Sequence, residues 1–275
     1  MIFIIRSILL FVCAATVFVG TAHGQKNSLG LTPAMVDANV KRGKTYVQEF
    51  TVVNDTGTRL RFHCFVNDYW YGEKNERVIT RPGTQPRSAS NWVQFSPSEI
   101  IIEPRSSGVV KAIISVPESA AGGYYTIPFF EGEPVEKPTD TQKDGTAIAA
   151  VAVRLGGLLM LATEDKSEYN LSVAGAKVLP PTAASALEMQ FDLNNSSTAH
   201  ARVRGMFVIL DAAGKIVGRG RVEEKRYLPG QRDFLNTTWA GELSSCKFTA
   251  IVTLTYDRAG SEPASLISEI PFDIR

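Results

Sequence analysis

The stretch that decides the fold class is NWVQFSPSEIIIEPRSSGVVKAIISVPESAAGGYYTIPFF, residues Asn91–Phe130. Its apolar runs are separated by Ser-Pro, Glu-Pro-Arg-Ser-Ser and Gly-Gly. Short runs of β-branched residues bounded by Pro, Gly and Ser are typical of β-strands. None of the runs has the apolar spacing of an amphipathic helix. This stretch therefore predicts an all-β protein.

The same pattern fills the chain on both sides, in two blocks that echo each other. FTVVNDTGT, residues Phe50–Thr58, matches FDLNNSSTA, residues Phe191–Ala199. Each has Phe, an apolar residue two positions on, Asn two positions after that, and then a small polar turn. Short strands with frequent turns favour β-sandwiches, and the echo favours two of them. We predict tandem immunoglobulin-like sandwiches at residues 25–163 and 168–275, joined through the polar stretch Thr163–Glu168.

The first 24 residues have the composition of a signal peptide. Arg6 precedes an apolar run from Ile8 to about Val19, and Ala22-His23-Gly24 supplies small residues for cleavage before Gln25. A membrane anchor is the alternative, but the run is short for a span of about 20 residues. Lipid attachment at Cys13 is disfavoured because this cysteine lies inside the apolar run. We expect an exported, periplasmic protein, with a cell-surface or secreted location as alternatives, and with no stable span after cleavage.

Charge and motifs exclude several function classes. Loss of Arg6 from the 29 basic residues leaves 28 against 28 acidic ones, so there is no basic bias for nucleic acid. His63 and His200, the histidines outside the leader, fall in different blocks and are predicted to be exposed on strands. No motif selects a catalytic, cofactor-binding or metal-binding residue. We predict a non-enzymatic protein without cofactors.

The two cysteines outside the leader and one aromatic cluster are assigned to the core. Cys64 and Cys246 each share a strand face with apolar residues, which favours small buried side chains over a disulfide. The cluster Tyr69–Tyr71 has two interpretations, a partner-binding patch or a core aromatic whose neighbours cover a sandwich end. The second interpretation is preferred.

A polar segment followed by the most apolar one stands out after the quoted stretch. Glu131–Thr146 is charged, contains two prolines and is expected to form an exposed, mobile hairpin loop. Ala147–Ala162 reads AIAAVAVRLGGLLMLA and fits a long strand better than a membrane span, because it contains Arg154.

Several motifs together resemble bacterial envelope proteins related to the periplasmic pilus-assembly chaperones of the PapD type. They are LGLTPAMVDANVKRGKTYVQEFTVVNDTG, RSASNWVQFSPSEIIIEP, VPESAAGGYYTIPFFE and AVRLGGLLML. The resemblance runs through most of the chain after the leader and is strongest over residues 91–161. It implies two immunoglobulin-like domains, an exported location and no catalysis.

In that family, a strand after a long loop lends alternating apolar side chains to an incomplete subunit sandwich. Position and pattern match residues 147–161 here, and the implied partner-binding residues are Ala149, Val151, Val153, Arg154 and Leu155. The physical basis is β-augmentation, in which an extended edge supplies main-chain hydrogen bonds.

The family also holds a subunit carboxylate with a basic pair between the domains. The first strand here, Ser28–Ala38, has no Arg or Lys, and Arg154 is either the second basic partner or a solvent-facing residue. Gly156-Gly157 is expected to bend or bulge the strand.

These observations lead to one principal hypothesis and its alternatives. The principal hypothesis is a chaperone-like binding protein of the cell envelope that engages another exported protein, such as a pilus or surface subunit, through a sheet edge. The first alternative is a structural surface module that binds cell-wall polymer or spaces envelope components. An enzyme would need carboxylates or both histidines to converge in a cleft. The oligomeric state is left open.

Overall fold

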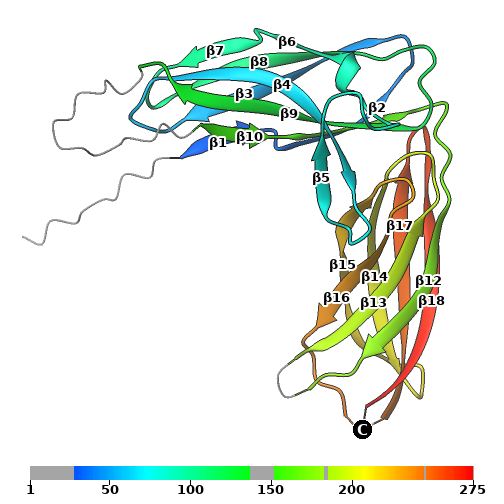
Figure 1. Ribbon diagram of the computed structural model, residues 1–275. Helices are drawn as coiled ribbons and strands as arrows, with labels where there is room; N and C mark the ends of the chain where they lie inside the picture. Colours follow the sequence, from blue (N-terminus) through cyan, green and yellow to red (C-terminus); the bar gives the residue numbers. More distant parts are fainter. Residues whose placement is uncertain (1–27, 137–151, 183–184, 245, 275) are drawn as a thin grey trace, which may run out of the picture.

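The computed structural model describes residues 28–136, 152–182, 185–244 and 246–274. These residues form eighteen strands and one short 3-10 helix, Ser90–Trp92. Two β-sandwiches meet at an elbow, one built from β1 to β11 and the other from β12 to β18 (Figure 1). The prediction of an all-β chain with two sandwiches is confirmed.

The first sandwich has two sheets. One sheet has the order β1 (Leu29–Thr32), β3 (Thr45–Asn54), β8 (Ser106–Ser115) and β6 (Val93–Ser96). The other has the order β2 (Met35–Val40), β11 (Leu158–Thr163), β9 (Gly123–Pro134), β4 (Leu60–Tyr71) and β5 (Arg77–Thr80). Two short strands join the second sheet: β10 (Val153–Gly156) pairs with β9, and β7 (Glu99–Ile102) pairs with β4.

Alternation along the strands builds the first core. In β8, Val110, Ala112 and Ile114 are buried, while their neighbours Val109 and Lys111 face solvent. A period of two puts successive side chains on opposite faces of a sheet. The inward residues of both sheets meet as one cluster that contains Phe50, Phe62, Cys64, Ile102, Val110 and Phe130. Much of the quoted stretch is therefore core by virtue of its alternation.

The first strand changes sheets. Leu29–Thr32 pairs with β3 in one sheet, and after Pro33 and Ala34 the chain pairs in parallel with β11 of the other sheet. Met35 lies opposite Leu158, so the parallel pairing begins only at β11. β10 precedes β11 along the same edge and has β9 as its one strand partner within the described ranges.

The second sandwich is a smaller version of the same design. One sheet has the order β12 (Leu171–Leu179), β13 (Leu187–Asn195) and β16 (Arg232–Trp239). The facing sheet has the order β15 (Ile216–Tyr227), β14 (Ala201–Asp211), β17 (Cys246–Arg258) and β18 (Ser261–Ile274). Its core is one cluster, in which Leu187, Met189, Phe191 and Leu193 come from the alternating residues of β13.

The two matching sequence motifs form the same arrangement of hydrogen bonds, one in each sandwich. The buried Asn54 side chain donates to the carbonyl oxygens of Thr58 (2.8 Å) and Ile102 (3.1 Å). The buried Asn195 side chain donates to the carbonyl oxygens of Ala199 (3.2 Å) and Tyr227 (2.7 Å). In both, the amide oxygen accepts from the backbone N–H two residues on. Each asparagine thus ties its own turn to the end of another strand.

Four side chains were assigned from the sequence with mixed success. Cys64 is buried and both described cysteines are free thiols, as predicted. Cys246 is exposed, which corrects the prediction, because β17 begins at this residue at the free end of the second sandwich. His63 is exposed as expected, but His200 is buried where the two sandwiches meet.

Candidate functional site

The edge strand β10 is the described part of the predicted partner-binding segment. Val153 lies opposite Gly132 in β9, and Gly156 lies opposite Phe129. β11 continues the same register, with Leu159 opposite Thr126. The register does not shift through Gly157, so the described strands have no bulge at Gly156-Gly157, where a bend or a bulge was predicted. The glycines instead permit close packing, since a Cβ on Gly156 would lie 2.7 Å from the Phe129 ring.

The side chains of β10 alternate between two environments. Leu155 is half-buried and packs against the first core, while Val153, on the same face, is 40% exposed near the open edge of the sandwich. Arg154 points to the opposite face. Ala149 and Val151 lie outside the described residues, as does most of the predicted loop Glu131–Thr146. The described strand therefore offers two apolar side chains, Val153 and Leu155, beside an unpaired edge.

Arg154 is held on the outer face of the sheet. Its Nη2 lies 2.7 Å from the Glu131 carboxylate. Its guanidinium lies over two aromatic rings, 5.1 Å from the Phe65 centroid and 5.4 Å from that of Phe129. An ion pair and cation–π contacts thus fix a side chain that is still about half exposed.

An aromatic cluster fills the inner side of the elbow. Tyr69 is fully buried and packs with Tyr125, Ile127, Phe129 and Met160 on the outer face of the first sandwich. Leu228, from the turn between β15 and β16, joins this cluster from the second sandwich. Trp70 and Tyr71 are partly buried against it. One aromatic of the cluster, Tyr69, is buried, but it lies at the junction between the sandwiches and not in the core of one, which corrects the preferred interpretation.

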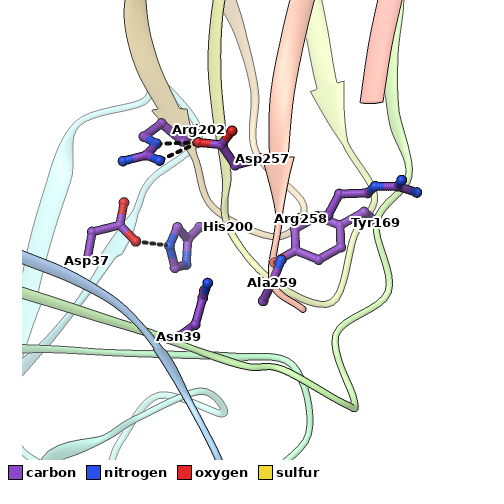
Figure 2. A pocket seen from close by; sticks show the side chains of 8 residues that line it. All are labelled: Asp37, Asn39, Tyr169, His200, Arg202, Asp257, Arg258 and Ala259. Atoms are coloured by element: carbon purple, nitrogen blue, oxygen red, sulfur yellow. Dashed lines mark hydrogen bonds and ion pairs between the residues drawn. The ribbon is translucent and has the colours of Figure 1, made fainter. Parts of the chain in front are cut away.

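A charged network crosses the same junction (Figure 2). Asp37, in β2, forms hydrogen bonds with His200 Nε2 (2.9 Å) and Arg226 Nε (2.8 Å) of the second sandwich. Arg226 also pairs with Glu224 at 2.9 Å. Next to it, Asp257 accepts from Arg202 and from Arg204 (2.8 Å). Asp37 is the one carboxylate that the first sandwich contributes to this set.

The electrostatics of Asp37 follow from its surroundings. Burial alone would raise the pKa of this carboxyl group, but the hydrogen bonds and charges of His200 and Arg226 outweigh burial and hold its pKa well below 3.8. Hydrogen bonds from Arg204 and Arg202 likewise lower the pKa of Asp257 against the opposing effect of burial. Carboxylates saturated by cations are poor general bases. The cavity of about 100 Å³ that they line is thus better explained as a structural junction than as a catalytic site.

Three further contacts brace the elbow. The tip of the β4–β5 hairpin reaches the second sandwich, where the Asn75 side chain donates to the Arg232 carbonyl oxygen at 2.9 Å. Gly123 N–H donates to the carbonyl oxygen of Thr198 at 2.8 Å. At the outer side, Arg42 and Asp165 form an exposed ion pair. A cavity of about 340 Å³ remains on the inner side, between Leu158, Met160 and Tyr69 of the first sandwich and Lys225 and Leu228 of the second.

The basic side chains near this inner cavity are mostly engaged within the chain. Arg226 is bound to Asp37, and Lys225 lies 2.6 Å from Asp233. Arg77 lies over the Tyr69 ring at 5.8 Å. Sequence reasoning missed Asp37, His200 and Arg226 as a group. They are far apart along the chain, and no spacing rule connects residues of two separately folded units.

Comparisons with known proteins were made with this geometry in hand. No protein-family profile and no curated protein matches the sequence. Among solved structures, a chain of the chaperone–tip adhesin complex of CFA/I fimbriae biogenesis is similar at 14% identity and a TM-score of 0.46, covering 88% of this chain and 98% of that one. The class 5 fimbriae chaperone CfaA has 13% identity and a TM-score of 0.46, with 88% and 99% covered. The Salmonella enterica SafA pilin–SafB chaperone complex gives 11% identity and a TM-score of 0.40, with 88% and 96% covered.

These structural neighbours are fimbrial chaperones, and the likeness extends over most of the chain. The fold assignment for this protein comes from its own strand pairing, described above. Within the described ranges, no helix has the length and hydropathy to cross a membrane. The same residues bring together no group of three or more His, Cys, Asp or Glu side chains that could hold a metal ion.

Proposed function

We propose that this protein is an exported, non-enzymatic, chaperone-like binding protein of the cell envelope, which engages another exported protein by adding a strand of that partner to β10. In this proposal residues 1–24 are a signal peptide, and the sandwiches are domains spanning about 25–163 and 168–275. The periplasm is the expected location.

The observation that carries the proposal is the unpaired edge at Val153–Gly156. Leu29–Thr32 pairs with β3 of the other sheet, and the chain joins the sheet of β9 only opposite β11, so the described residues leave the free side of β10 without a strand. An extended edge with free N–H and C=O groups is a template for an added strand. Val153 and Leu155 supply the alternate apolar side chains that such a mode uses.

The braced elbow supports the same function. The contacts of Asp37 and Asn75 with the second sandwich hold a fixed angle, so the edge is presented by a rigid scaffold. Preorganisation of a binding surface lowers the entropy lost when a partner docks.

Site-specific photo-crosslinking tests the proposal. A photoreactive amino acid at the exposed residue Ala152, introduced in cells that produce the full chain, is expected to give a discrete adduct with an exported protein. Val153→Asp in the same chain should abolish the adduct, because a carboxylate would be driven into the apolar contact. The matched control carries the photoreactive group at Ile267, which is 69% exposed on the second sandwich.

Two results would contradict the proposal. One is an adduct from residue 152 that still forms in the Val153→Asp variant, or the same adduct formed from residue 267. The other is sedimentation of the protein with purified cell wall, unaffected by Val153→Asp and without any protein adduct. The second result would favour a structural module that binds wall polymer.

A further inference from the structure

A row of polar side chains crosses the outer face of the first sandwich and ends at the free edge. Arg154 in β10 lies opposite Glu131 in β9, and Glu131 lies opposite His63 in β4. His63 in turn lies opposite Glu99 in β7. Directly opposed residues on one face of a sheet interact across the strands, and opposite charges are the favourable arrangement. The row therefore ends at Arg154, whose free side has no strand within the described residues.

Arg154 is held ready for a new acceptor. Both Nε (3.1 Å) and Nη2 (2.7 Å) donate to the same oxygen of Glu131, and the rings of Phe65 and Phe129 support the guanidinium from below. Nη1 makes no hydrogen bond within the described part of the chain, and the side chain is 48% exposed. Because the guanidinium is already ordered, a second carboxylate would bind it with little loss of side-chain entropy.

Arg154 is also the charge that a new strand would meet first. Its outer-face neighbours on β10 are Ala152 and Gly156, which are uncharged. The backbone of a strand paired with β10 would lie about 4.8 Å from that of β10 and about twice as far from that of β9. Because Glu131 Oε1 already lies 2.7 Å from Arg154 Nη2, a partner carboxylate would reach the guanidinium through Nη1.

We propose that the partner strand carries an aspartate or glutamate opposite Arg154. This inference rests on the proposed function and specifies its partner: an extended segment of an exported protein with an acidic residue on the outer face. The residues on either side of this acid in the segment are apolar and turn toward Val153 and Leu155.

Three synthetic peptides of one alternating sequence test the inference. They differ in a single outer-face residue, which is Glu, Gln or Lys, and their binding to the chain from residue 25 to residue 275 is measured by fluorescence anisotropy. Amide hydrogen exchange of Val153–Gly156 reports whether a peptide occupies the edge. We expect the Glu peptide to bind about 3- to 30-fold more tightly than the Lys peptide, with Gln between them. Added salt should reduce this ratio.

The double variant Glu131→Arg/Arg154→Glu is the decisive comparison, since it keeps the ion pair within the sheet and places the acid at the edge. It should prefer the Lys peptide. Arg219→Glu, an exposed change on β15, should leave the original ranking intact. One outcome is that the peptides protect the edge of the double variant from amide exchange and bind it in the same order of affinity as they bind the unmodified chain. In that case the inference is wrong and the proposed function stands. If no peptide protects Val153–Gly156 in the unmodified chain, the proposed function fails and the inference fails with it.

Discussion

Buried asparagines at the ends of β3 and β13 show how one residue can hold a turn in place. Asn54 and Asn195 are both inaccessible to solvent, and each satisfies carbonyl groups from its own turn and from a distant strand. A buried carbonyl oxygen that loses its donor costs more than a typical hydrogen bond contributes. The same residue type in the same local pattern therefore has the same structural role in both sandwiches.

We expect Asn195→Ala to lower the free energy of unfolding by roughly 1–3 kcal/mol, because the carbonyl oxygens of Ala199 and Tyr227 lose their donor inside the protein. Urea denaturation followed by tryptophan fluorescence measures the change. Asn170→Ala removes an exposed amide and should cost less than about 0.5 kcal/mol. Equal costs for the two variants would contradict this role.

The two cysteines should differ strongly in reactivity. Burial raises the pKa of the Cys64 thiol to about 12, with a smaller contribution from the Glu99 charge, whereas Cys246 is exposed. Thiol reagents attack the thiolate. At pH 8 we expect one thiol of the chain from residue 25 onward, Cys246, to be modified in the native protein and two in denaturant. Cys246→Ser should then show no reaction until it unfolds, and rapid native labelling of that variant would count against a closed first core.

At the scale of elements, the sheet edges differ in how they are protected. β18 carries Pro263 and Pro271, which have no N–H to offer, and β12 contains a register shift between Val173 and Gly175. Prolines and irregularities are common protections against unwanted pairing. β10 contains neither a proline nor a bulge. The proposed partner edge therefore lacks both protections, as does β16 at an edge of the second sandwich.

The β4–β5 hairpin is an element whose tip serves the junction. Asn75 has a left-handed backbone (φ 59°) and bonds both Arg232 and Gln231 of the second sandwich. Asn75→Gly keeps this backbone conformation accessible and removes both side-chain contacts. Amide exchange of Arg77–Thr80 should become several-fold faster, while Lys74→Ala, at the same turn, should have little effect. Unchanged exchange in Asn75→Gly would mean that the hairpin is held by other contacts.

Most strands could be predicted from the alternation of apolar and polar residues, because a strand buried on one face has an apolar residue at every second position. β8 and β13 are clear cases, and the asparagine echo marked corresponding turns. The continuous register through Gly156-Gly157 could not be predicted, since glycine permits a bulge without requiring one. The exposure of Cys246 was also missed, because alternation gives the face of a residue and not its distance from the end of a sandwich.

At the scale of the whole molecule, Asp37 links the sandwiches by charge. Its ordinary pKa of 3.8 is lowered in the folded protein, since the effect of His200 and Arg226 exceeds that of burial. A lowered carboxyl pKa contributes stability that is fully present above the unfolded value and is lost as the pH falls below about 4. His200 and Arg226 had no sequence signal that tied them to Asp37, so this junction became evident only in three dimensions.

Asp37→Asn should therefore destabilise the protein by about 1–3 kcal/mol at pH 7, and the difference from the unmodified chain should shrink at pH 3. Because two sandwiches can unfold separately, the midpoint of each urea transition is compared at both pH values. Asp273→Asn, an exposed change near the end of β18, serves as the control. A pH-independent difference for Asp37→Asn would show that its charge is not what stabilises the junction.

The division of the first strand between two sheets also dictates an order of assembly. β2 pairs in parallel with β11, and Arg42 forms an ion pair with Asp165, which lies 123 positions later in the chain. Ribosomes and export channels deliver a chain from its N-terminus. The first sandwich therefore cannot close until its last strand has emerged, by which point the linker to the second is already arriving. Until then, the N-terminal part of the chain is an incomplete sandwich. Its unpaired strands are open to the same kind of strand addition that is proposed for β10 in the folded protein.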